Sequence, residues 1–169
     1  MGGKSASALS VDLQVACDAP ELPSQPEIEA WLQMALGESD VSATRDVEVS
    51  IRVVDEEESQ DLNKRFRGKD RSTNVLAFPA GRSDSTGLPN DGPQLLGDLV
   101  ICAPVVAREA AEQGKEPAAH WGHMLVHGLL HLLGFDHDSD AEAVRMESLE
   151  VSILAARGLE NPYKDEDSN

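Results

Sequence analysis

The sequence has little cysteine, little basic charge and no long apolar segment, and each shortage argues against a class of protein. Its two cysteines, Cys17 and Cys102, lie far apart and form no CxxC pair, which suits free thiols in a reducing cytosol better than a disulfide scaffold or a thiolate metal site. No apolar run approaches the ~20 residues of a membrane span, and the N-terminal MGGKSASALS lacks the apolar centre of a secretory signal. We therefore expect a cytoplasmic protein that does not bind membranes.

Basic residues are outnumbered, with 14 Lys and Arg against 31 Asp and Glu and a formal net charge of -17. A surface with this charge repels nucleic acids and anionic lipids, so any nucleic-acid site must be local. Two explanations of the acidity stay open: life at high internal salt, or a surface that restricts a polyanion to one basic groove.

Strand and helix patterns alternate along the 169 residues, a length typical of one domain. The expected strands span 11–17, 47–53, 74–79 and 96–102. The expected helices span 26–36, 56–66, 104–113, 117–133 and 140–157. A loop rich in Gly, Pro, Asp and Ser covers 81–94, and the polar tail 160–169 is expected to be flexible. The pattern predicts an α+β fold in a single domain over 1–169: a small mixed four-stranded sheet covered by about five helices.

The segment HGLLHLLGFDH, residues 127 to 137, carries three histidines at spacings of four and six. On a helix, His127 and His131 share one face with a rise of about 6 Å between them, so their imidazoles can converge on one ion. Gly134 offers a helix stop, after which a short turn can bring back His137 as a third ligand. Three protein ligands and an open position are what a catalytic zinc site needs, so we expect one zinc ion per chain. The alternative is an amphipathic helix whose histidines merely lie at a polar edge.

The same spacing matches the metzincin protease pattern HExxHxxGxxH, except that position 128 is Gly instead of Glu. That glutamate is the general base of the protease, so its absence argues against peptide hydrolysis while preserving the metal. His123 lies about 12 Å from His131 along a straight helix, too far for both to bind one ion, and is a candidate to orient a ligand or face the substrate. His120 is expected to be exposed near the helix start.

A basic patch precedes the third expected strand. In KRFRGKDR, residues 64 to 71, five of the chain's 14 basic residues occupy eight positions: Lys64, Arg65, Arg67, Lys69 and Arg71. Guanidinium groups grip phosphate in a bidentate manner, so an arginine that faces the zinc could hold a phosphate and offset charge building on it. The alternative is a solvated loop whose cations pair with the neighbouring acidic run 56–58.

Three segments carry a family resemblance: LNKRFRGKDRSTNVLAFP, then LLGDLVIC, then HWGHMLVHGLLHLLGFDHD. In this order and separation they resemble the YbeY family of bacterial endoribonucleases, over most of residues 45 to 160. The resemblance implies a zinc-dependent, single-strand-specific endoribonuclease that matures ribosomal RNA, notably the 3′ end of the small-subunit rRNA, and takes part in ribosome quality control. It implies RNA, the small ribosomal subunit and its assembly factors as partners, and no DNA.

The resemblance also implies roles for individual residues. The family's zinc ligands fall on His127, His131 and His137, and its functional arginine falls on Arg67. Many members have TDVLSFP where this chain has TNVLAFP, so no acidic role is assigned to Asn74. The family's usual tyrosine is Phe66 here, which argues against an essential role for that hydroxyl. Phosphate contacts are expected from the other four cations of the patch, Lys64, Arg65, Lys69 and Arg71.

The expected mechanism combines metal and arginine catalysis. Zinc polarises a phosphate oxygen or a water, Arg67 stabilises the charged transition state, and either that water or the RNA's own 2′-hydroxyl attacks phosphorus. The general base stays open between a water at the metal, His123 and the substrate. Asp98 and Asp136 are candidates to orient a histidine's second ring nitrogen, although a strand-edge turn and a local cap explain them equally well.

Two other functions stay open. One is a metal-dependent hydrolase of a peptide or small molecule, which the ligand spacing supports and Gly128 opposes. The other is a non-catalytic ribosome-assembly factor, in which zinc only ties the final loop to its helix. A closed, four-ligand metal site would favour the second.

Overall fold

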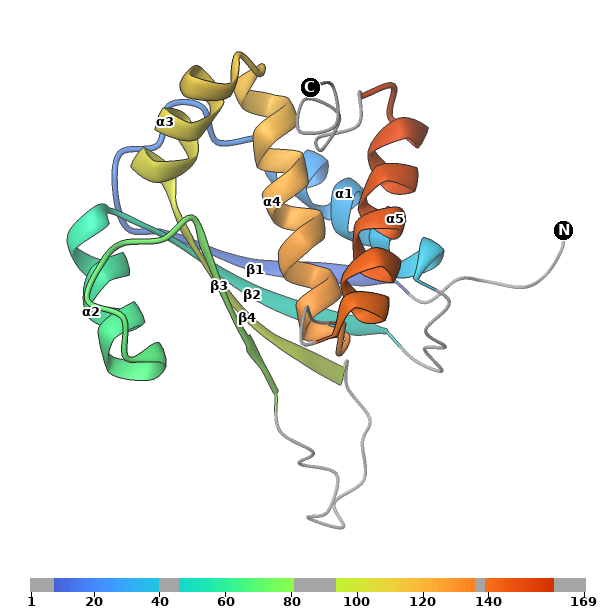
Figure 1. The fold of residues 1–169 in the computed structure, drawn as a ribbon, viewed down its shortest axis with the longest axis horizontal. Helices are drawn as coiled ribbons and strands as arrows, with labels where there is room; N and C mark the ends of the chain where they lie inside the picture. The colour runs from blue at the N-terminus through green and yellow to red at the C-terminus, as the bar shows by residue number, and fades with distance from the viewer. Residues whose placement is uncertain (1–7, 40–45, 81–93, 136–138, 160–169) are drawn as a thin grey trace, which may run out of the picture.

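The computed structural model describes residues 8–39, 46–80, 94–135 and 139–159. Its strands are β1 (Leu9–Val15), β2 (Val47–Val54), β3 (Val75–Pro79) and β4 (Gln94–Cys102). Its helices are α1 (Gln25–Glu38), α2 (Glu56–Arg67), α3 (Ala103–Gln113), α4 (Pro117–Leu132) and α5 (Asp140–Ala156) (Figure 1). Every expected element is present in the expected order, with ends shifted by two residues or fewer. Of the loop expected over 81–94, all but Gln94 lies outside the described residues, as does the tail 160–169.

The four strands form one mixed sheet in the order β1-β2-β4-β3. β1, β2 and β4 run parallel, and β3 pairs with β4 in the antiparallel direction, so β3 forms one edge. The ladder between β2 and β4 shifts register where β4 accommodates Leu96 as an extra residue. Gly97 follows with a φ of 150°, and a Cβ atom there would lie 2.5 Å from the carbonyl oxygen of Phe78. Only glycine fits at this close approach of β4 to β3.

Helices cover both faces of the sheet (Figure 1). α1 and α4 pack on one face and α5 packs against them, which buries the larger apolar cluster, including Val49, Ile51 and Leu99 of the sheet. A smaller cluster around Val100 and Cys102 lies on the opposite face, near α2 and α3. The expected α+β fold, a mixed four-stranded sheet with five helices, is confirmed. Among the described residues, no helix combines the length and the apolarity that crossing a bilayer requires.

Two glycines let α4, the central helix, approach its neighbours closely. A Cβ atom at Gly122 would lie 2.4 Å from Cζ2 of Trp31 on α1, and one at Gly128 would lie 2.8 Å from Cδ2 of Leu99 on β4. Interiors are packed too densely to absorb such overlaps without movement. These contacts fix how α4 lies on the sheet, and therefore where the histidines on either side of Gly128 point.

Candidate metal centre and catalytic cavity

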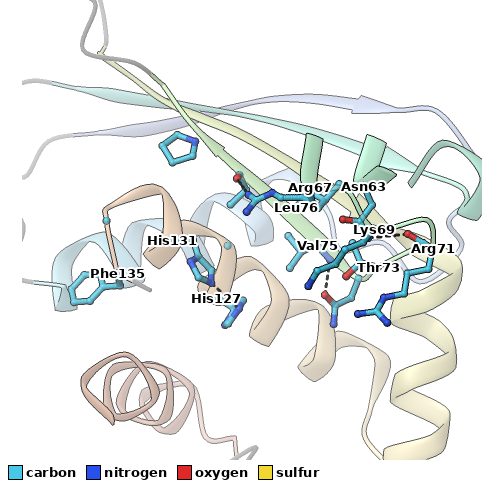
Figure 2. Close-up of a pocket in the computed structure, with 15 residues that line it drawn as sticks. Asn63, Arg67, Lys69, Arg71, Thr73, Val75, Leu76, His127, His131 and Phe135 are labelled. Atoms are coloured by element: carbon cyan, nitrogen blue, oxygen red, sulfur yellow. Dashed lines mark hydrogen bonds between the residues drawn. The ribbon is translucent and has the colours of Figure 1, made fainter. Parts of the chain in front are cut away.

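Two histidines of α4 come together one helical turn apart (Figure 2). The Nε2 atoms of His127 and His131 lie 3.2 Å apart, and their ring centroids lie 4.6 Å apart. Two nitrogens on one tetrahedral zinc, each at ~2.0–2.1 Å, would be separated by about 3.3 Å. The two lone pairs can therefore reach a single ion, and the donor set fits zinc.

α4 ends immediately after this pair. Gly134 has a φ of 106°, and the N–H of Phe135 donates to the carbonyl of Leu130 at 3.0 Å, which closes the helix end. This is the stop that the sequence predicts. The expected third ligand, His137, lies outside the described residues. Within the described residues no three potential ligands converge, so the three-histidine site stays a prediction.

A buried carboxylate on α5 orients the first histidine of the pair. Glu150 is fully buried, with Oε2 at 2.6 Å from Nδ1 of His127 and Oε1 at 3.0 Å from Nε2 of His123. A carboxylate only accepts hydrogen bonds, so both ring nitrogens donate. His127 therefore carries its proton on Nδ1 and keeps the lone pair of Nε2 for a metal.

Sequence reasoning did not single out Glu150, although a signal was present. The residue falls in the buried stripe of α5, between Met146 and Ile153. An acidic side chain on an apolar stripe must find a partner or lose much stability, so it marks a functional or structural pair. The partner comes from α4, and only the packing of the two helices identifies it.

The structure corrects the expectation that His120 is exposed. This residue is 2% exposed, because the start of α4 packs against α3. Its Nε2 lies 2.9 Å from Oε1 of Glu109 on α3. Burial lowers the pKa of His120, and the Glu109 carboxylate opposes that shift.

The same carboxylate also binds Asn74, the residue just before β3. The side-chain amide of Asn74 donates to both oxygens of Glu109, at 3.1 and 3.2 Å. Its Oδ1 accepts the backbone N–H of Val75 at 2.6 Å. An aspartate at position 74 would place two carboxylates in contact, so the amide suits this chain.

A cavity of about 800 Å³ is lined by residues of α4, of β3 and of the segment that follows α2 (Figure 2). His127 and His131 line it from α4, and Arg67, Lys69 and Arg71 line it opposite them. Gly128 also lines this cavity, and a Cβ atom there would lie 2.8 Å from Cδ2 of Leu99, so the glutamate of the protease pattern would fit only if the core moved.

Arg67 is tethered at the cavity wall. Its Nη2 donates to the carbonyl of Ala77 on β3 at 2.7 Å, and its guanidinium lies 5.7 Å from the centre of the Phe78 ring. α2 ends at Arg67, and Gly68, with a φ of 72°, turns the chain so that Lys69 and Arg71 follow along the same cavity.

The other two cations of the patch lie outside the cavity. Lys64 lies 3.8 Å from Asp70, and Arg65 lies 2.7 Å from Asp61. The acidic run 56–58 pairs elsewhere among the described residues: Glu56 with Arg108 and Glu58 with Arg52. All five cations are exposed, but three of them line the cavity and two lie outside it.

One of the two aspartates considered as histidine partners, Asp98, does not face the histidines of α4 in the described structure. Asp98 is exposed and lines a separate cavity of about 500 Å³, together with Phe66. Side chains alternate along β4, so buried Leu99 faces α4 and Asp98 faces the other way. Asp136 lies outside the described residues. His123 is buried and does not line the cavity.

Comparison with known proteins gives a consistent result. Residues 14–158 match the family model described as Endoribonuclease YbeY. The chain is 48% identical over 156 residues to a protein of Colwellia psychrerythraea with that name, covering 92% of this chain and 97% of the relative. It is 52% identical over 143 residues to one from Halorhodospira halophila, covering 85% and 89%. A solution structure from Thermotoga maritima shares the fold, with a TM-score of 0.51, 24% identity, and coverage of 95% and 98%.

Proposed function

The chain belongs to the endoribonuclease YbeY family, and on that premise we propose that it is a zinc-dependent endoribonuclease that cleaves single-stranded RNA in the cavity between α4 and β3. The observation that carries the proposal is the convergence of His127 and His131, 3.2 Å apart, opposite a cationic wall. Pockets for small ligands measure ~300–1,000 Å³. A cavity of about 800 Å³ suits a few nucleotides of a single strand better than a duplex.

The proposed ligands are His127, His131 and His137, with one zinc ion per chain. When bound, zinc supplies Lewis-acid chemistry at a phosphate oxygen or a water. Glu150 supports this assignment because it holds the proton of His127 on Nδ1, away from the metal side of the ring.

Arg67 would bind the scissile phosphate and offset the charge that develops on it. Of its five N–H donors, the bond to Ala77 occupies one on Nη2, and the tether limits the loss of side-chain entropy when phosphate binds. Lys69 and Arg71 would contact neighbouring phosphates in the same cavity. Lys64 and Arg65 would contact only nucleotides that extend beyond it.

The chain offers no glutamate base at position 128, and the buried position of His123 argues against that residue as the base. The proton acceptor is then a water or the RNA itself. Attack by the 2′-hydroxyl would leave a cyclic phosphate, and attack by water would not. Mass spectrometry of the product ends distinguishes the two.

We assign this activity to ribosomal RNA processing in the cytoplasm: maturation of the small-subunit rRNA 3′ end and ribosome quality control, with the small subunit and its assembly factors as partners. The support is the family membership. Purified small subunits that carry a 3′-extended rRNA are the substrate that tests this role. The expected product is a shortened 3′ end, and an unchanged extension would contradict the assignment.

The activity itself is tested with a labelled single-stranded RNA and zinc-loaded protein, alongside Arg67→Ala and His131→Ala. Arg108→Ala is the matched control, because Arg108 is exposed, pairs with Glu56 and lies outside the cavity. We expect wild type and Arg108→Ala to cleave, and the two cavity variants to lose at least ~100-fold in rate at unchanged folding. Equal cleavage by all four proteins would identify a contaminating nuclease. No cleavage by any would favour another substrate or an assembly role.

A further inference from the structure

One edge of β3 faces the cavity, and no strand of the described structure pairs with it. Just outside the two ends of β3, Asn74 accepts from the N–H of Cys102 and the N–H of Ala80 donates to Leu96, so the even-numbered positions bond to β4. In an antiparallel ladder the alternate, odd-numbered positions direct both backbone groups away from β4. Residues 75, 77 and 79 therefore present their backbone to the open edge. The bond from Arg67 to the carbonyl of Ala77 independently shows this direction.

The three outward positions of β3 differ in what they offer. The N–H of Val75 is occupied by Oδ1 of Asn74 at 2.6 Å. Pro79 has no N–H at all. Only the N–H of Ala77 remains as a donor, and it has no acceptor among the described residues. Edge strands commonly block their outward backbone N–H groups. On β3, positions 75 and 79 are blocked and position 77 between them is not.

Ala77 lines the same cavity as the histidine pair, and its carbonyl holds the guanidinium of Arg67. A free N–H beside a cation and a metal site is a place for an anionic oxygen, and backbone N–H groups are common donors to phosphate in nucleic-acid complexes. The neighbouring residues of Ala77 on both sides pair with β4, so its N–H is held in a fixed direction. Such a donor need not reorient when negative charge develops on the oxygen that it binds.

We propose that the backbone N–H of Ala77 donates to a non-bridging oxygen of the scissile phosphate and stabilises it in the transition state, next to Arg67. This role rests on the proposed RNA cleavage in the same cavity. The side chain of residue 77 contributes nothing to the contact, so ordinary alanine scanning does not reveal it.

The test replaces the peptide N–H by an ester oxygen, by incorporating lactic acid in place of Ala77. The exchange removes one donor without adding bulk. The matched control is the same exchange at Ala118, whose N–H lies in the first turn of α4, where no intrahelical acceptor exists. Ala77→Pro is a second, genetically encoded variant that also removes this N–H. The strand already holds a proline at an equivalent outward position, Pro79, two residues further along.

We expect the ester at position 77 to lower kcat for single-stranded RNA by ~10–100-fold, with KM changed by less than about threefold, while zinc content and thermal unfolding match the Ala118 ester. Ala77→Pro should lower kcat in the same direction. If the wild type cleaves and the ester at 77 retains its kcat, the N–H plays no part and this inference fails alone. If the wild type does not cleave RNA, the proposed function itself fails.

Discussion

Replacing Glu150 by glutamine tests whether the buried carboxylate sets the ligand state of His127. Both carboxylate oxygens accept hydrogen bonds, one from His127 at 2.6 Å and one from His123 at 3.0 Å. Glutamine has the same shape but offers one acceptor and one donor. If its amide nitrogen faces His127, that ring must carry its proton on Nε2 and loses the lone pair that zinc needs. If it faces His123, His127 keeps its proton on Nδ1 but donates to a neutral amide oxygen instead of a carboxylate, which makes its ring a weaker metal ligand.

Loss of a partner that orients a ligand typically weakens metal binding by 10–100-fold. We therefore expect Glu150→Gln to raise the Kd for zinc by ~10–100-fold, which is about 1.4–2.7 kcal/mol. The shorter Glu150→Ala would in addition remove the acceptor of both hydrogen bonds and leave a cavity in the core, which lowers the free energy of unfolding. Glutamine is therefore the cleaner perturbation.

Competition with a fluorescent zinc chelator measures the affinity. Glu109→Gln is the matched control, because it makes the same change at a second buried histidine of α4, His120, two helical turns from the metal pair. The control should bind zinc as the wild type does. A Kd for Glu150→Gln within twofold of the wild-type value would refute the claim that this carboxylate prepares His127 for a metal.

Three further outcomes follow from the structure. Gly128→Glu should destabilise the protein by about 1–3 kcal/mol and create no peptidase, because its Cβ would lie 2.8 Å from Leu99; urea unfolding and a peptide substrate check both points. The three cations of the cavity predict a slope of about -2 when the logarithm of RNA affinity is plotted against the logarithm of salt concentration. Arg71→Ala should make this slope shallower by about 0.7, as measured by fluorescence anisotropy. An unchanged slope would show that Arg71 contacts no phosphate. Because burial lowers the pKa of His120, the unfolded chain binds a proton below about pH 6.5 that the folded protein does not, so stability should fall as pH decreases through that value. His120→Gln should flatten this dependence, and an equal pH dependence in both proteins would contradict it.

Local patterns in the sequence predict the elements and their ends well. The second helix starts where the sequence predicts it, directly after Asp55, whose side chain caps the helix by accepting the N–H of Glu58 at 2.9 Å. The stop at Gly134 and the shared face of His127 and His131 likewise depend only on residues close in sequence. Helical geometry fixes such relations before any tertiary packing is known.

Relations between distant segments could not be predicted in the same way. Glu150 lies 23 residues from His127, and its role depends on how α5 packs against α4. Asp98 was a candidate because it is acidic, but the alternation of β4 directs it away from α4. The basic patch is divided because α2 ends at Arg67, which leaves Arg65 on the helix outside the cavity and brings Lys69 to the cavity wall.

The most direct test of the account is anomalous diffraction at the zinc edge, from crystals of the zinc-loaded protein bound to a single-stranded RNA that it cannot cleave. We predict one anomalous peak at ~2.0–2.1 Å from Nε2 of both His127 and His131, with a phosphate between that peak and Arg67. A metal bound elsewhere, or RNA lying on the face of the sheet that carries Asp98, would contradict the assignment of this cavity as the active site.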